Sequence, residues 1–293
     1  FLMCLTNVAL AGPWMTGPLL APAGNTVPAG HINIEPYGFY TVYPMGFRNL
    51  AGTPIFTFGL NNFLDLQISA PFDYTWRKGQ HGGGVGDASA ALGIQILKQK
   101  EGSYLPDLRL LVQEVIPTGR FEDLDPRKLG TDQTGLGAYQ TFLWFNFQQL
   151  LHLYDVHYLR TRLSLSVSKA SKVKVHGFNV FGGGFLTEGI VNPGSSRSID
   201  LAFEYSLTQH WVPVFEALYA HNSSVNFRGS SGFTPGGDTA DIGGEKSDQL
   251  SFAPALEYNF NANIGVIGGV WFTVSERQSP KFTSGVIAIN IYL

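Results

Sequence analysis

Few residues of this chain stand in an arrangement that could catalyse a reaction. His221 lies close to Ser223 and Ser224, but near-consecutive residues rarely form a hydrolytic serine–histidine site. Segments 82–86, 229–232 and 244–247 lack the strand, turn and helix that a phosphate-binding loop or a nucleophile elbow requires. Four acidic residues lie close together in the sequence and could bind a cation, but a solvated acidic loop is the favoured interpretation: Asp238, Asp241, Glu245 and Asp248. We therefore predict that the protein is not an enzyme and holds no cofactor or metal.

A second set of charged residues lies inside segments in which polar and apolar side chains alternate. The set consists of Glu35, Asp65, Arg109, Arg160, Arg162, Glu204, Glu216 and Glu257. Charged side chains that project into one enclosed space can form a ring that selects solutes by charge. They can equally form a paired network that fills the space, because buried charges need partners. Both interpretations require a fold that brings these eight side chains close together in one enclosed space.

Alternation with a period of two runs along almost the whole chain and predicts β-strands. In the last segment, Ile287, Ile289 and Ile291 face one way, whereas Ala288 and Asn290 face the other. Most of the alternating segments approach the length of about 9–11 residues that a tilted strand needs to cross a bilayer. They are residues 31–43, 53–60, 63–75, 88–99, 107–117, 134–148, 156–168, 196–208, 211–221, 249–260, 263–275 and 281–293.

The connections between these segments alternate in length. Short connections follow every second segment, and long connections rich in Gly, Ser and Asp occupy residues 76–87, 118–133, 169–195 and 222–248. Short turns on one side and long loops on the other are typical of a transmembrane antiparallel up-and-down β-barrel, with the short turns in the periplasm. The sequence therefore predicts an all-β barrel of about twelve strands over residues 31–293. A further hairpin within residues 169–195 is the alternative that would change the count.

The composition favours a bacterial outer-membrane protein. Charged residues make up 14% of the chain, against about 25% in soluble domains, and aromatic residues make up 13%. The net charge of -3 argues against nucleic acid as a partner. We expect the partners to be outer-membrane lipids, lipopolysaccharide and a small-molecule solute. The last segment resembles the signal that the barrel-assembly machinery recognises, with Leu293 in place of the usual Phe.

The N-terminal region divides into two predicted parts. Residues 1–11 resemble the end of a signal peptide, because residues 9–11 have the small-x-small form that signal peptidase cleaves. Residues 12–30 are rich in Pro and Gly, and Pro excludes them from the interior of a sheet. Their apolar side chains are Trp14, Met15, Leu19 and Leu20. This segment is either a plug inside the barrel or a mobile periplasmic leader.

The barrel also predicts where the charged set lies. Its apolar face meets lipid and its polar face lines the lumen, so the charged set occupies the lumen at a similar depth near the periplasmic end. The aromatic residues Tyr37, Trp211, Tyr258 and Phe260 lie near strand ends, where an interfacial girdle is expected.

Several segments resemble a known family of bacterial outer-membrane barrels, the MetA-pathway phenol-degradation family. The similar segments are residues 56–71 (FTFGLNNFLDLQISAP), 86–88 (GDA), 111–119 (LVQEVIPTG), 203–208 (FEYSLT) and 252–258. The resemblance implies passage of small solutes, apolar or aromatic ones among them, across the outer membrane. It implies no catalytic or binding residues.

Three functions follow from this fold. The first is an outer-membrane channel or transporter for small solutes, gated by the charged set and the N-terminal segment. The second is an outer-membrane lipid hydrolase, for which His221 with Ser223 or Ser224 is the available pairing. The third is a structural or adhesive barrel that acts through its long extracellular loops.

Overall fold

The computed structural model describes residues 13–100 and 102–293 of the chain. The predicted signal-peptide remnant, residues 1–11, lies outside the described residues. Among the residues that are described, no helix has the length and apolar character needed to span a membrane.

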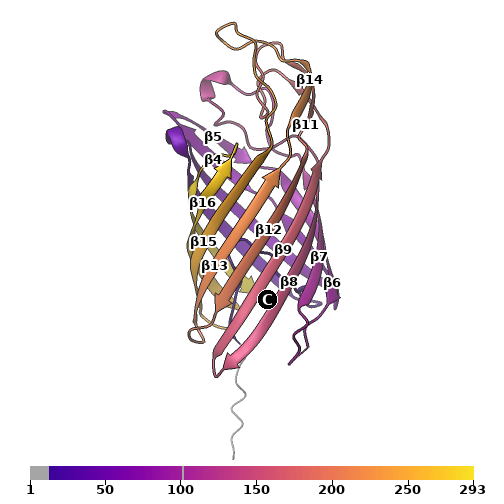
Figure 1. Ribbon diagram of the computed structural model, residues 1–293, viewed down its shortest axis with the longest axis vertical. Helices are drawn as coiled ribbons and strands as arrows, with labels where there is room; N and C mark the ends of the chain where they lie inside the picture. The colour runs from indigo at the N-terminus through magenta and orange to yellow at the C-terminus, as the bar shows by residue number, and fades with distance from the viewer. Residues whose placement is uncertain (1–12, 101) are drawn as a thin grey trace, which may run out of the picture.

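The described chain forms a closed antiparallel β-barrel (Figure 1). Neighbours in sequence pair along the wall, and β1 pairs with both β2 and β17, which closes the barrel. Two barrel strands are each interrupted once, between β3 and β4 at Pro71 and between β5 and β6 at Gly86, so the wall has twelve strands. The wall consists of β1 (Ile32–Val42), β2 (Arg48–Asn61), β3 (Leu64–Ser69) with β4 (Phe72–Arg77), β5 (Gln80–Val85) with β6 (Ala88–Leu97), β7 (Asp107–Ile116), β8 (Gln140–Tyr154), β9 (His157–Ala170), β12 (Ser195–Tyr205), β13 (Trp211–Asn222), β15 (Ser247–Asn259), β16 (Ile264–Arg277) and β17 (Thr283–Tyr292).

Alternation along each strand separates two environments. On β12, the outward side chains of Ile199, Leu201 and Phe203 are 51%, 37% and 41% exposed, whereas Asp200 and Glu204, at the alternate positions, are buried in the lumen. Successive residues of a strand point to opposite faces, so one apolar stripe per strand gives the barrel its lipid-facing belt. The predicted all-β barrel of twelve strands is confirmed.

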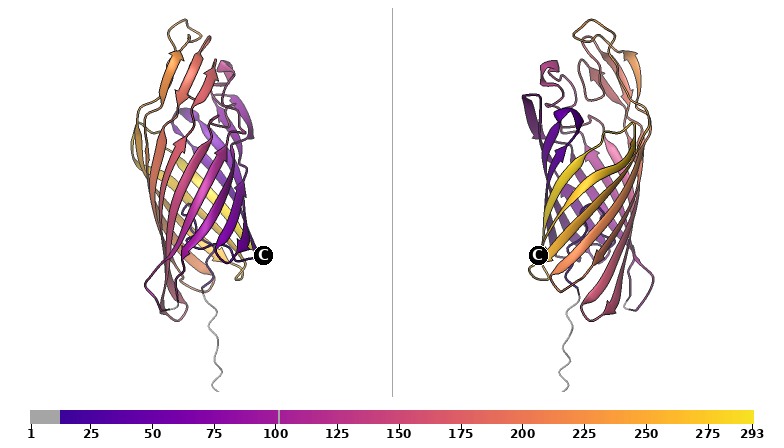
Figure 2. Two further views of the ribbon diagram at one scale, coloured as in Figure 1. Left: turned by 90° about the vertical axis from the view of Figure 1, so that its right-hand side faces the viewer. Right: turned by 60° about the vertical axis from the view of Figure 1, so that its left-hand side comes forward.

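The long loops gather at one end of the barrel, which we call the extracellular end, and we call the opposite end, with the short turns, the periplasmic end. There β10 (Val173–His176), β11 (Glu188–Asn192) and β14 (Asn226–Ser230) form a separate antiparallel sheet that stands above the wall (Figures 1 and 2). Val175 and Val191 of this sheet are buried against Phe181. The 3-10 helices η1 (Pro44–Gly46) and η2 (Pro126–Lys128) lie in the connections. The hairpin allowed for within residues 169–195 therefore exists as β10 and β11, but it adds nothing to the barrel wall.

Three predictions of detail are wrong. Residues 76–87 are not a long loop, because β4 and β5 continue as a hairpin that turns at Lys78 and Gly79, both with positive φ. The sixth strand begins at Gln140 rather than at residue 134. Tyr37 is not part of an aromatic girdle, because its side chain lines the lumen. Tyr258 contacts both Trp211 and Phe260, where β13 begins and β15 ends.

Candidate functional site

The N-terminal segment from Pro13 to Pro28 lies inside the barrel, and we call it the plug. It contains no helix or strand, and four of its residues are proline, which cannot donate a backbone hydrogen bond. The plug joins the wall where Gly30 N–H donates to the carbonyl of Gly59, just before β1. Its backbone amides and carbonyls therefore need partners from the lumen side chains.

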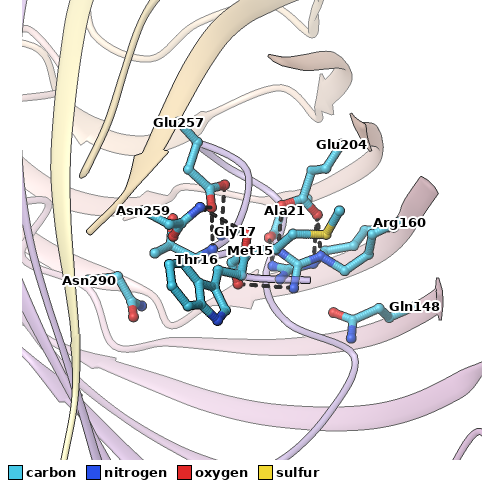
Figure 3. Close-up of polar contacts among 12 residues, drawn as sticks. Met15, Thr16, Gly17, Ala21, Gln148, Arg160, Glu204, Glu257, Asn259 and Asn290 are labelled. Carbon is cyan, nitrogen blue, oxygen red and sulfur yellow. Dashed lines mark hydrogen bonds and ion pairs between the residues drawn. The ribbon is translucent and has the colours of Figure 1, made fainter. Parts of the chain in front are cut away.

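Two glutamates on neighbouring strands bind consecutive backbone amides of the plug, and Figure 3 shows the first of them, Glu257. Glu257 of β15 accepts hydrogen bonds from the N–H groups of Thr16, at 2.5 Å, and Gly17, at 3.4 Å. Glu216 of β13 accepts from the N–H groups of Leu19, Leu20 (3.0 Å) and Ala21 (2.9 Å). Hydrogen bonds to an ionised acceptor are roughly twice as strong as neutral ones. These carboxylates supply the acceptors that an irregular segment lacks on its own.

Two arginines of β9 bind carbonyl groups of the same segment. Arg160 Nη1 donates to the carbonyl of Met15 at 3.3 Å, and Arg162 Nη1 donates to that of Ala21 at 3.0 Å. Glu204 of β12 pairs with both, through a 2.5 Å hydrogen bond from Arg160 Nε and a 3.8 Å contact with Arg162. Glu204 thus fixes both guanidinium groups against the plug backbone, and Figure 3 shows its contact with Arg160.

A third ion pair lies at the other end of the plug. Arg109 of β7 donates to Asp65 Oδ1 at 2.5 Å, and both side chains are buried. Asp65 Oδ2 accepts from the N–H of Val27 at 3.0 Å. Gly93 of β6 lies directly beneath this pair, because a Cβ there would stand 2.0 Å from Asp65 Oδ1. A side chain at Gly93 would push the ion pair apart.

Neutral amide side chains hold the plug between Ala21 and Val27. Gln95 accepts from Thr26 N–H at 2.7 Å and donates to the carbonyl of Gly24 at 3.0 Å. Gln148 accepts from Gly24 N–H at 3.4 Å and donates to Asn25 Oδ1 at 3.2 Å. Neither glutamine was among the predicted lumen residues, although the alternation of β6 and β8 places both on the polar face.

The apolar residues of the plug pack against one side of the lumen. Leu19 is 2% exposed and lies in a cluster with the lumen-facing side chains Val212, Val214, Ala253, Ile267, Val286 and Ala288. Met15 and Leu20 pack against the edge of this cluster. Trp14 lies edge-on to His210 at 5.0 Å, and its carbonyl accepts from Asn259. The lumen therefore has an apolar side, on β13 and β15–β17, which alternation did not predict.

The structure brings the predicted charged set and the predicted plug residues together. Five of the charges contact the plug backbone directly: Asp65, Arg160, Arg162, Glu216 and Glu257. Arg109 and Glu204 reach the plug through the ion pairs described above. Glu35 accepts from Asn290 at 3.2 Å and lines the lumen beside the plug. Within the described residues, no group of three or more His, Cys, Asp and Glu side chains is placed to hold a metal ion.

The plug separates two cavities. The first, which we call the lumen cavity, has a volume of about 480 Å³ and is lined by plug residues and by wall residues such as Tyr37, Trp144 and Asp200. The second, the vestibule, has a volume of about 810 Å³. The vestibule lies at the periplasmic end, between the connection after β6 and the β8–β9 hairpin, and Met15 and Asn25 of the plug line it.

A closed twelve-stranded wall with an apolar belt and a plugged, charged lumen defines an outer-membrane type of β-barrel. An outer membrane channel from Pseudomonas putida F1 superposes with a TM-score of 0.67 at 13% identity, covering 94% of this chain and 100% of that chain. The β domain of the Bordetella autotransporter BrkA gives a TM-score of 0.48 at 7% identity, covering 90% and 100% of the two chains. The NanC porin gives 0.43 at 10% identity, covering 88% and 98%.

At the level of sequence, residues 18–151 match the family described as "Putative MetA-pathway of phenol degradation". The matched region begins within the plug and extends into β8. It therefore includes Asp65 and Arg109 but not the ionised groups of β9–β15. The comparison with curated protein sequences gave no match.

Proposed function

We propose that the protein is a channel of the bacterial outer membrane that passes small solutes, and that the plug sets its closed state. The observation that carries the proposal is the position of the plug between two cavities: the vestibule at the periplasmic end, and the lumen cavity, which is lined by plug residues and by wall residues nearer the extracellular end, such as Phe39, Ser198 and Ala220. A barrel of this size has a narrow interior, so a single irregular segment is enough to divide it. The charged set then acts as a clasp for the plug rather than as an open filter.

The lining of the lumen cavity supports small, partly apolar solutes, aromatic ones among them. Its volume of about 480 Å³ falls in the range of roughly 300–1,000 Å³ that is usual for small-molecule sites. Tyr37, Phe39 and Leu218 provide apolar surface, whereas Asp200 and Gln113 provide hydrogen-bonding groups. The description of the matched family agrees with this solute class.

Conductance in planar lipid bilayers tests the proposal. The full chain should give small, intermittent currents, and the variant Glu216→Gln/Glu257→Gln should give larger and longer openings, because the plug loses its ionised acceptors. Glu276→Gln is the matched control, since this carboxylate pairs with Lys281 and lies away from the plug. If neither the wild type nor the double variant conducts ions or passes small solutes into liposomes, the channel function is wrong.

One observation favours a second function, the binding of a partner by the extracellular loops around the β10–β11–β14 sheet. Three large apolar side chains are exposed on its loops: Phe185, Phe233 and Leu186, the last with 79% exposure and a positive φ. If the protein does not conduct, binding through this surface becomes the favoured function. The hydrolase alternative has weaker support, because both candidate serines have other partners: Ser223 Oγ accepts from Ser195 N–H, and Ser224 Oγ accepts from Asn226.

A further inference from the structure

The two halves of the plug are held by different kinds of interaction. Residues 14–21, which we call the anchored half, are bound by Glu257, Glu216 and the two β9 arginines, and they carry the buried Leu19. Residues 22–26, which we call the strap, are hydrogen-bonded to the described wall residues only through the neutral side chains of Gln95 and Gln148. Hydrogen bonds to a charged group are roughly twice as strong as neutral ones, so the strap is held more weakly than the anchored half.

The strap is fixed at both of its ends. Ala21 precedes it and is bound through its N–H by Glu216 and through its carbonyl by Arg162. Val27 follows it and is bound by Asp65, which Arg109 holds in turn. A segment with firmly bound ends and weakly bound middle residues can bow away from the wall without release of either end.

The strap also forms part of the partition between the two cavities. Asn25 lines both the lumen cavity and the vestibule. Arg162 lines the lumen cavity and Arg160 lines the vestibule, although they are successive lumen-facing residues of β9. Gln148, which binds Asn25, belongs to the wall of the vestibule. On the opposite side of the lumen, the Leu19 cluster fills the space between plug and wall.

We propose that solutes cross the barrel between the strap and β8, at Gln148, while the anchored half stays docked. This inference rests on the proposed channel function and specifies which part of the plug moves. Gly24 makes the closed state possible, because a Cβ at this position would stand 2.4 Å from Gln148 Cβ and 2.8 Å from its backbone nitrogen. The passage is therefore closed by direct contact between the plug backbone and β8.

Two disulfide crosslinks distinguish this route from the alternatives. In a Cys4→Ser background, Gly24→Cys/Gln148→Cys ties the strap to β8, where the two β-carbons would be in contact and need only a small shift to reach the usual separation of about 3.5–4.5 Å. The matched variant Thr16→Cys/Gly265→Cys ties the anchored half to β16, because a Cβ at Gly265 would lie 2.2 Å from Thr16 Cγ2. Conductance is measured before and after reduction, with crosslinking confirmed by mass spectrometry.

We expect oxidation to abolish conductance in the strap variant, reduction to restore it, and neither treatment to change the anchored variant. Conductance that persists with the strap crosslinked would overturn the route. Loss of conductance on crosslinking the anchored half would show that the whole plug must move, and would also overturn it. No conductance in the reduced proteins and the wild type would overturn the channel function itself.

A single added methyl group provides a second measurement that needs no crosslink. Gly24→Ala should raise the conductance, because the new Cβ meets the β8 backbone and holds the strap away from Gln148. Gly285→Ala adds the same group on β17, where no atom lies within 4 Å of the new Cβ, and should have no effect. Equal conductance in the two variants would contradict the proposed passage.

Discussion

Replacing Glu216 by glutamine changes the side chain that accepts the most hydrogen bonds from the plug backbone. The two carboxylate oxygens accept from the N–H groups of Leu19, Leu20 and Ala21, two bonds to Oε1 and two to Oε2, with Leu20 shared. Glutamine keeps one acceptor oxygen and turns an N–H₂ donor toward the amides that the other oxygen served. One strong hydrogen bond is therefore lost, and the remaining two become neutral.

The size of the effect follows from these bonds. A charged hydrogen bond contributes about 1.5–3 kcal/mol and a neutral one about 0.5–1.5 kcal/mol, and neighbouring bonds are not additive. We expect the docked state of the plug to lose about 2–4 kcal/mol relative to the undocked state, in which the carboxylate is hydrated by the lumen. Since about 1.4 kcal/mol corresponds to a factor of ten, the ratio of undocked to docked plugs should rise roughly 30-fold to 1,000-fold. An undocked plug opens the whole lumen, in addition to the passage at the strap that is available while the anchored half stays docked.

Two assays check this expectation. Single-channel recording measures the fraction of time spent in the large openings of an undocked plug, and limited proteolysis measures the access of a protease to residues 13–28. Glu276→Gln serves as the control in both. A Glu216→Gln protein that folds normally, with no increase in large openings and an equally protected plug, would refute the assignment of Glu216 as a clasp.

Three further changes test the energetics of the lumen. Leu19→Ala leaves a cavity in the apolar cluster and should cost plug docking about 2–5 kcal/mol, seen as more frequent openings from a barrel with unchanged urea stability. Asp65→Ala leaves Arg109 buried without its carboxylate and should lower the free energy of unfolding by about 3–5 kcal/mol. The double variant Asp65→Leu/Arg109→Leu, which leaves no unpaired charge, should recover part of this loss. Equal stability of the single and double variants would contradict the prediction. Asp200→Asn removes a buried acidic group from the lumen cavity and should shift the reversal potential in a salt gradient toward anion permeation. An unchanged reversal potential would place Asp200 outside the ion path.

Alternation in the sequence identified the lumen charges because the barrel imposes a local rule. Glu204 and Glu216 lie opposite apolar neighbours on β12 and β13, and both are fully buried in the lumen as their parity requires. Alternation gave wrong or incomplete predictions where the side chains on the two faces of a strand do not differ in polarity. Three of the six residues of β5 are glycine, so the β4–β5 hairpin was predicted as a loop. Val212, Val214 and Ile267 face the lumen although they are apolar, because Leu19 of the plug covers them.

The sequence by itself determined the class of fold, the two faces of the wall and the identity of the charged lumen residues. These properties depend on neighbours one and two residues apart and on the contrast between lipid and lumen, which a single strand already records. Only the tertiary structure decided which charge meets which partner. The plug amides that bind Glu216 are 195–197 residues away in sequence, and no local pattern encodes such a separation. The same holds for the contact of Gly24 with Gln148, which exists only once the barrel has closed around the plug.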